Sequence, residues 1–312
     1  MKLGIFSTII DNFGDAGFTI RLAKAMTKII TPKDITIYTD YVDLFYKMVP
    51  DTEINIKNFK DYNDKNDIIF FMFQHIPDQN TLNKINKSSK KALIIDYFTT
   101  EKWADEANDK MSFVNGLKIS VEYIVPGLSD NSAGILNFPL TSTTKKTKNN
   151  VYLYSPEKVL KILKLGTIWG YKKETNLKKM PFLPQKEFDS YLLGAKYNWI
   201  RGEDSFQLAL NSGIPFFWEA YKQKDSIHHT KVKAFIEFIS PFFKNESLKQ
   251  KYIKMTNYLN DIEKIDLKEL ESIYDFYEEN YTALKEAFEC IKLHFKNKTN
   301  LQDFLIKKVT FL

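Results

Sequence analysis

The sequence predicts an α/β protein with two domains, each built on a parallel sheet. The chain has 312 residues, more than the ~250–300 residues at which a single hydrophobic core usually stops growing. Strand-like apolar runs alternate with a helical pattern in the N-terminal half, which is typical of parallel sheets covered by helices. Residues 141–150 are polar and carry no periodicity, as in a linker. We therefore expect one domain over residues 1–145 and a second over 146–312.

The N-terminal elements follow from the spacing of apolar side chains. Residues 2–10 predict a first strand, and residues 11–17 predict a turn because Gly14 and Gly17 allow a tight backbone. Apolar residues then recur at helical spacing, which predicts a helix over 18–30. Further short runs of buried-strand type lie at 34–39, 68–73 and 92–96.

The second half of the chain repeats the strand pattern and then becomes helical. Its β-like runs lie at 151–154, 166–170, 197–200 and 215–218. Helical spacing begins at Lys231 and continues through 252–262, 267–280 and 282–297. Ligands of open α/β sheets bind at the carboxyl ends of the strands. Two such domains side by side would therefore place the chemistry in the cleft between them.

Composition excludes several classes of protein. With 11 Gly, 10 Pro and 1 Cys, the chain is neither collagen-like, nor of low complexity, nor a disulfide scaffold. No apolar stretch approaches the ~20 residues of a membrane span, so we expect none. The lone Cys290 cannot form an internal disulfide, which fits a cytoplasmic protein. The net charge of +6 is spread among 39 acidic residues, so it permits a nucleic-acid partner without indicating one.

Arginine, histidine and cysteine are all sparse in this chain. Among the 45 basic residues only Arg21 and Arg201 are arginine. A guanidinium is a planar fork with five donors that lysine cannot replace. Both positions therefore indicate a structural or functional requirement for arginine. The four His and the one Cys show no metal-ligand spacing, so we expect no metal site.

The first candidate site is the segment that follows the first predicted strand. Asp11 and Asp15 bring two carboxylates to the tip of that strand. The segment lacks the glycine triplet of a dinucleotide fingerprint and the Gly-Lys-Ser/Thr of a Walker loop. Two acids in one loop, with Arg21 on the following helix, favour a site. A helix N-cap for Asp15 and an Asx-turn for Asp11 are the structural alternatives.

The second candidate site is residues 198–207, where a strand enters a glycine turn and then a helix. Backbone N–H groups at such a helix start suit a diphosphate, and Ser205 could donate a further hydrogen bond. Glu203 and Asp204 argue against a purely phosphate role, because carboxylates repel phosphate. An ordinary capped helix with a surface pair between Arg201 and a glutamate is the structural alternative.

The third candidate site is aromatic. Phe182 and Phe188 flank a Pro–Gln turn in which Gln185 could hydrogen-bond a nucleobase. Together with Tyr152 and Tyr154 they could form a base-stacking box. Aromatic residues at such spacing more often belong to the core, so this alternative stays open.

These segments resemble a known family. Residues 11–23 and 198–206 are similar to the two signatures of the bacterial elongation factor P arginine rhamnosyltransferases. The similarity continues through 213–218 and Tyr221, and residues 97–103 resemble the family's Tyr–x–x–x–Glu–x–Trp segment. It implies an α/β GT-B fold, with two Rossmann-like domains facing across a cleft. The implied reaction is metal-independent, inverting transfer of L-rhamnose from dTDP-β-L-rhamnose to an arginine of elongation factor P.

The resemblance also implies a role for each candidate residue. The N-terminal domain would bind the acceptor and the C-terminal domain the nucleotide sugar. Asp15 would be the catalytic carboxylate, with Asp11 as its partner and Glu203 as a third essential acid. The thymidine and its sugar would contact Tyr152, Tyr154, Phe182, Gln185 and Phe188, and the diphosphate end would contact Arg201, Asp204, Ser205 and Tyr221.

Several departures from the family leave alternatives open. Phe13 stands where Tyr is common and Thr99-Thr100 where Ser-Ala is usual, and the helical C-terminal third matches poorly. One alternative is a GT-B transferase with a different nucleotide sugar or acceptor. Another is a non-catalytic module that binds a nucleotide sugar or a translation factor. We expect no membrane partner and no direct nucleic-acid partner.

Overall fold

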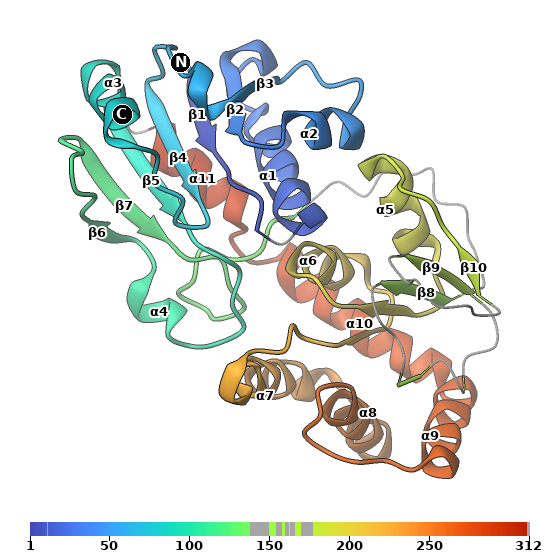
Figure 1. Ribbon diagram of the computed structural model, residues 1–312. Coiled ribbons are helices and arrows are strands. Elements are labelled where there is room, and N and C mark those ends of the chain that lie inside the picture. Colours follow the sequence, from blue (N-terminus) through green and yellow to red (C-terminus); the bar gives the residue numbers. More distant parts are fainter. Residues whose placement is uncertain are drawn as a thin grey trace. The chain divides into compact units, whose positions relative to one another are not determined.

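The computed structural model describes residues 1–10, 12–137, 150–153, 158–159, 162, 166–169 and 177–310, with the backbone alone at positions 12, 152, 153 and 169. The chain forms two compact units (Figure 1). Met1–Phe138 and Lys298–Leu312 make up the first, and Pro139–Asn297 the second. This division differs from the predicted one mainly at the C-terminus, where the last segment joins the N-terminal unit.

The first unit is built on a seven-stranded sheet with the order β3-β2-β1-β4-β5-β7-β6. All neighbouring strands are parallel except β6, which pairs antiparallel with β7. The strand order reverses between β1 and β4, which makes their carboxyl ends the switch point of the sheet. The strands are β1 (Leu3–Phe6), β2 (Ile35–Thr39), β3 (Asn55–Asn58), β4 (Ile68–Met72), β5 (Lys91–Ile95), β6 (Lys110–Ser112) and β7 (Ser120–Ile124).

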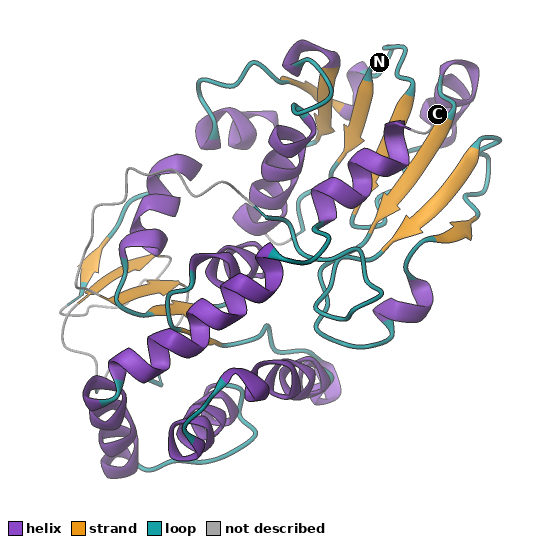
Figure 2. Cartoon of the chain, turned by 180° about the vertical axis from the view of Figure 1, so that it is seen from behind, coloured by secondary structure: helices purple, strands orange, loops and turns teal. Residues whose placement is uncertain are grey.

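Helices cover the sheet of the first unit, and one of them comes from the far end of the chain. Figure 2 shows this last helix, α11, lying across a face of the sheet. Leu301, Leu305 and Val309 of α11 are buried in the same apolar cluster as residues of α1 and β1. The helices are α1 (Asn12–Met26), α2 (Val42–Met48), α3 (Gln79–Ser88), α4 (Ala104–Ala107) and α11 (Leu301–Thr310), with short 3-10 turns at Pro32–Asp34 and Phe59–Asp61.

A glycine and a main-chain hydrogen bond fix the return of the chain to the first unit. Gly134 has a φ of +79°, and a Cβ there would lie 2.5 Å from the carbonyl oxygen of Thr299. The N–H of Leu301 donates to the carbonyl of Ile135 at 2.9 Å. The expectation that the C-terminal helices all belong to the second domain therefore does not hold for α11, because its apolar face completes the core of the first unit.

The predicted turn over residues 11–17 is wrong. The first strand ends at Phe6 and α1 already begins at Asn12, so Gly14 and Gly17 are helical residues. Neither glycine has a positive φ. The apolar residues that follow them on α1 are buried against the sheet. Burial of that face outweighs the ~1 kcal/mol by which each glycine disfavours a helix.

The second unit is built on a five-stranded parallel sheet with the order β10-β9-β8-β11-β12. Its switch point lies between β8 and β11. The strands are β8 (Asn150–Leu153), β9 (Gly166–Trp169), β10 (Lys178–Lys179), β11 (Asn198–Ile200) and β12 (Phe216–Trp218). The strand predictions for this half of the chain are confirmed, whereas residues 141–149 of the predicted linker lie outside the described residues.

Several helices of the second unit begin earlier than the apolar pattern indicates. The predicted Pro–Gln turn is wrong because Pro184 is the N-cap of α5, which starts at Gln185. His228 and His229 are the first two residues of α7. The helices are α5 (Gln185–Gly194), α6 (Glu203–Ser212), α7 (His228–Ile239), α8 (Glu246–Leu259), α9 (Leu267–Glu279) and α10 (Tyr281–Lys296), with 3-10 turns at Lys224–Ser226 and Ser240–Phe242.

Aromatic residues form much of the second core. The ring of Phe206 on α6 lies 4.6 Å from Trp218 on β12 and 5.1 Å from Phe235 on α7. These contacts fix α6, and with it the start of that helix, against the end of the sheet. Within the described ranges, no helix combines the length and the apolar composition that crossing a bilayer requires.

Candidate functional site

The first unit places Asp15 beside the switch point of its sheet. Asp15 lies in the first turn of α1, and its side chain is only 3% exposed. Its carboxylate accepts a hydrogen bond of 2.8 Å from the backbone N–H of Ile10. A negative charge is stabilised at this position by the helix dipole. Asp15 is not the N-cap, since α1 begins three residues earlier, and Asp11 lies outside the described residues.

Tyr97, which follows β5, contacts the same carboxylate. Its hydroxyl donates to Oδ2 of Asp15 at 3.5 Å, and its ring stacks on Phe73 at a centroid distance of 4.4 Å. Phe73 and Gln74 follow β4 with left-handed φ values of 54° and 59°. Two consecutive non-glycine residues in this region are strained. The side-chain amide of Gln74 donates to Asp96 at 3.1 Å. This hydrogen bond holds the strained pair Phe73-Gln74 in place beside the ring of Tyr97.

The second unit places Arg201 and Gly202 between β11 and α6, again beside a switch point. Gly202 is the N-cap of α6 and has no side chain to cap the first N–H groups. The hydroxyl of Ser205 donates to the carbonyl of Gly202 at 2.8 Å. A Cβ at Gly202 would lie 3.8 Å from the hydroxyl oxygens of both Ser205 and Tyr221. Two hydroxyls therefore flank a helix start that is suited to an anion.

Arg201 is held by its backbone and by one aromatic face. Its carbonyl accepts a hydrogen bond of 3.0 Å from the indole N–H of Trp218. Its guanidinium carbon lies 4.7 Å from the ring centroid of Tyr221, a cation–π contact. The Nε atom of Arg201 is buried and has no hydrogen-bond partner within the described residues.

Glu203, the first residue of α6, forms an ion pair with Lys231. The Lys231 ammonium on α7 lies 3.3 Å from Oε1 of Glu203, and both side chains are about one quarter exposed. The structural alternative was a surface ion pair between Arg201 and a glutamate. Glu203 instead pairs with Lys231. Asp204 follows on the same turn and is half-buried.

The structure adds one acid that the sequence analysis missed. Glu219 follows β12 directly, and its N–H donates to the carbonyl of Ile200 at the end of β11 at 2.9 Å. Burial raises the pKa of this carboxyl above its ordinary value, against the opposing positive charge of Arg201 and of two lysines. The signal that could have found it is its place after the predicted strand 215–218, the same kind of position that singled out Arg201.

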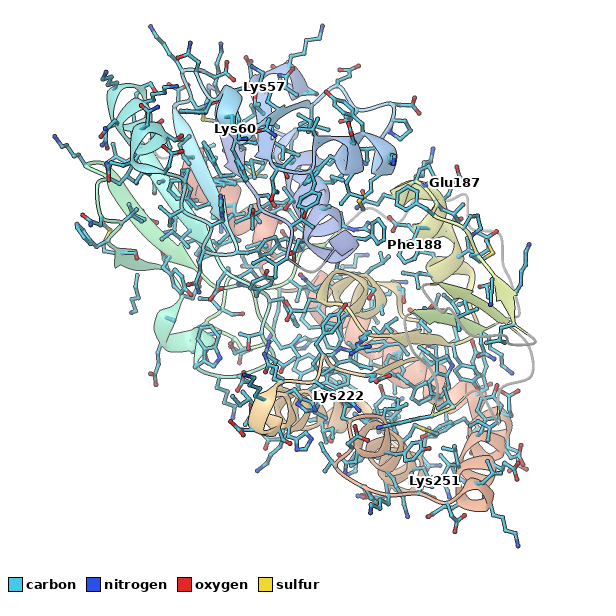
Figure 3. All side chains as sticks on the ribbon, in the orientation of Figure 1. Lys57, Lys60, Glu187, Phe188, Lys222 and Lys251 are labelled. Carbon is cyan, nitrogen blue, oxygen red and sulfur yellow. The ribbon has the colours of Figure 1, made fainter. Side chains whose placement is uncertain are left out.

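The predicted aromatic box is described only in part. Phe182 precedes α5 and is 43% exposed, whereas Gln185 is buried at the start of the helix. Phe188 lies in the first turn of α5 and is half-buried; Figure 3 marks it beside Glu187. Tyr152 lies on β8 with only its backbone described, and Tyr154 is outside the described residues.

Five of the predicted site residues lie around the start of α6 in the second unit: Arg201, Glu203, Asp204, Ser205 and Tyr221. Asp15 belongs to the first unit. No group of three or more His, Cys, Asp or Glu side chains that could hold a metal ion exists among the residues the structure describes.

Two units with parallel sheets of this topology have the fold of GT-B glycosyltransferases. One similar solved structure is that of "Structural basis for EarP-mediated arginine glycosylation of translation elongation factor EF-P". The similarity covers 100% of this chain and 99% of that chain, with a TM-score of 0.53 and 14% identity. It is similar over 99% of its length to the whole of the spinosyn rhamnosyltransferase SpnG complexed with thymidine diphosphate, with a TM-score of 0.54 and 7% identity. At these identities the similarity shows the fold alone.

The sequence defines the family within this class. The family model of the "Elongation-Factor P (EF-P) rhamnosyltransferase EarP" matches residues 3–153 and 143–310, so the chain belongs to that family. A protein-arginine rhamnosyltransferase of Neisseria meningitidis is 43% identical over 72 residues, which are 23% of this chain and 19% of that protein. One of Pseudomonas aeruginosa is 40% identical over 58 residues, or 19% and 15%. The chain thus matches about a fifth or less of the length of these curated relatives.

Proposed function

We propose that this protein is an inverting glycosyltransferase of the cytoplasm that moves L-rhamnose from dTDP-β-L-rhamnose to an arginine side chain of elongation factor P. Family membership along the chain supports the reaction and the acceptor. The thymidine diphosphate of one structural neighbour supports the donor, since the two proteins share a fold.

In this proposal the first unit binds the acceptor arginine. A guanidinium has a pKa above ~12, so a carboxylate cannot deprotonate it beforehand. Asp15 instead orients the guanidinium and accepts its proton as the new bond forms. Asp11 adds negative charge that attracts the cation, and Glu203 is a third essential acid. The burial of Asp15 and its hydrogen bond from Ile10 support this role, because they hold the carboxylate in one orientation.

The reaction exchanges one bond for another at the anomeric carbon of rhamnose. A guanidinium nitrogen attacks that carbon from the face opposite the phosphate, which inverts its configuration. The bond from the anomeric carbon to the phosphate oxygen breaks, and dTDP leaves with the electron pair. The proton lost by the guanidinium nitrogen goes to Asp15.

The second unit binds the donor and stabilises the departing diphosphate. The start of α6 and the cation of Arg201 supply positive charge. The hydroxyl of Tyr221 supplies a donor, and that of Ser205 supplies another once it turns away from the carbonyl of Gly202. Because these groups supply the charge stabilisation, we propose that transfer needs no metal and persists in EDTA. The remaining contacts to the donor in this proposal come from Asp204, Tyr152, Tyr154, Phe182, Gln185 and Phe188.

The observation that carries the proposal is the buried, oriented carboxylate of Asp15 at the switch point of a chain that belongs to this family. Incubation of elongation factor P with this protein and dTDP-rhamnose, followed by mass spectrometry of the intact acceptor, tests it. One added deoxyhexose on an arginine is expected. Transfer from a UDP-sugar instead would indicate a different donor, and donor binding without any transfer would indicate a non-catalytic module.

A further inference from the structure

Arg201 and Glu219 carry opposite charges at neighbouring strand ends, yet they do not pair. Ile200 and Trp218 are partners in the parallel register of β11 and β12, so Arg201 and Glu219 are the next residues along. Within the described residues, neither side chain forms a hydrogen bond or an ion pair, and the Nε atom of Arg201 is buried. A half-buried carboxylate and guanidinium side by side would ordinarily be expected to bond.

The nearby lysines do not neutralise Glu219, because both have another partner. The ammonium of Lys158 lies 2.5 Å from Asp261 and also donates to the carbonyls of Tyr258 and Leu259. The ammonium of Lys222 pairs with the second carboxylate oxygen of Asp261. Glu219 is thus left with an electrostatic attraction to these cations and no direct bond to any of them.

The backbone around Glu219 is fixed without its side chain. The amide of Asn260, which is 1% exposed, donates to the carbonyl of Trp218 at 2.9 Å and accepts from the N–H of Ala220 at 2.8 Å. The N–H of Glu219 itself is taken by Ile200 at 2.9 Å. The carboxylate is therefore not needed to hold the loop. A charged group that is partly desolvated, unbonded and held in a rigid frame is suited to bind a ligand.

We infer that Glu219 is a further donor-binding residue that accepts a hydroxyl of the nucleotide sugar while Arg201 binds a phosphate oxygen. The inference rests on the proposed function. A carboxylate accepts from an alcohol, and a guanidinium donates to phosphate. A nucleotide sugar carries both groups close together, because a diphosphate links a pentose to the transferred sugar. The hydroxyl can belong to the pentose or to the transferred sugar. The two cases can be told apart because dTDP contains the pentose but not the transferred sugar.

Calorimetric titration of Glu219→Ala with dTDP-rhamnose, dTDP and inorganic pyrophosphate tests the inference. A hydrogen bond to a charged group is worth about 10- to 100-fold in affinity, so the Kd for dTDP-rhamnose should rise by that factor. Pyrophosphate has no hydroxyl, so its Kd should be unchanged or lower once a negative charge is removed. A matching loss with dTDP identifies the pentose hydroxyl, and a loss confined to dTDP-rhamnose identifies the transferred sugar.

Two further variants make the result decisive. Glu219→Gln keeps a carbonyl acceptor and should lose less affinity than Glu219→Ala. Glu237→Ala removes an exposed glutamate from α7 and should change nothing. A Kd for dTDP-rhamnose within twofold of wild type in Glu219→Ala, or an equal loss for pyrophosphate, overturns the inference. Transfer by the wild type is measured separately, so a protein that binds the donor but transfers nothing refutes the proposed reaction alone.

Discussion

The ammonium of Lys231 lies 3.3 Å from a carboxylate oxygen of Glu203, and the two residues come from different helices of the second unit. Glu203 opens α6, and Lys231 lies in the first turn of α7. The orientation of the Glu203 carboxylate, a proposed essential acid, therefore depends on the position of α7.

If Glu203 acts in the reaction, Lys231 positions it. Lys231→Met should lower kcat for rhamnosyl transfer by about 10- to 100-fold, because a charge-assisted hydrogen bond that orients the carboxylate is lost. Lys231→Arg should retain most of the activity. Steady-state assays with elongation factor P measure both, with the exposed Lys233→Met on the same helix as the control. Unchanged kcat in Lys231→Met would separate this ion pair from the chemistry.

Asp15→Asn tests the proposed proton acceptor. Asparagine keeps a carbonyl that can accept from the N–H of Ile10, so the local fold should survive. It cannot take up the guanidinium proton, so kcat should fall by about 10²–10⁴-fold. Affinity for dTDP should stay the same, because the proposed donor contacts lie in the second unit. Asp43→Asn, an exposed acid in the first turn of α2, is the matched control. Full activity in Asp15→Asn would remove this carboxylate from the mechanism.

Phe188→Ala tests the proposed stacking on the base. Loss of one aromatic platform should weaken dTDP binding by about 1–3 kcal/mol, if the half-buried ring stacks on thymine. Titration calorimetry with dTDP measures the change. Tyr46→Ala, which removes a 45% exposed aromatic from α2, should leave the Kd unchanged. An equal Kd in Phe188→Ala and wild type would return Phe188 to a purely structural role.

Glu122 links the last helix, α11, to the sheet of the first unit through an ion pair. Its carboxylate lies 2.6 Å from the ammonium of Lys91 and 3.0 Å from that of Lys308 on α11. Burial alone would raise the pKa of this carboxyl, but the hydrogen bonds and charges of the two lysines outweigh burial and hold the pKa below its ordinary value of 4.5. The stability that Glu122 contributes is therefore present above pH 4.5 and is lost as the pH falls through the lower, folded pKa.

Glu122→Gln should accordingly lower the free energy of unfolding of the first unit at pH 7 by about 1–3 kcal/mol. The difference from wild type should shrink as the pH falls below 4.5. Urea unfolding at neutral and acidic pH measures it, with the exposed Glu53→Gln as the control. A difference that grows on acidification would contradict the assigned pKa shift.

The strands were the part of the fold that the sequence predicted best. The runs at 34–39 and 68–73 became β2 and β4 within one residue, because strands buried on both faces are nearly continuous apolar runs. The first helix was predicted six residues too late. Local glycine propensity indicated a turn at 11–17, and only burial of the helix against the sheet overrides that preference.

The candidate sites divide in the same way. The strand–glycine–helix pattern predicts Arg201 and Ser205, and the family resemblance adds Tyr221. The structure gathers all three around the start of α6. Glu219 and Lys231 were missed as site residues. Their significance depends on side chains that are remote in the chain, and no local pattern carries that information.

The amino-acid sequence is sufficient to predict two α/β units of parallel strands, acids and an arginine that follow particular strands, and motifs that resemble one family. Those properties are local, because they depend on side-chain period, backbone preference and motif spacing. Three relationships can be seen only in the folded protein. The helix α11 completes the first core, and Lys231 pairs with Glu203. Among the described residues, Arg201 and Glu219 follow neighbouring strands without a bond between their side chains. Such relationships arise from which distant segments pack together, and packing depends on the burial of whole faces.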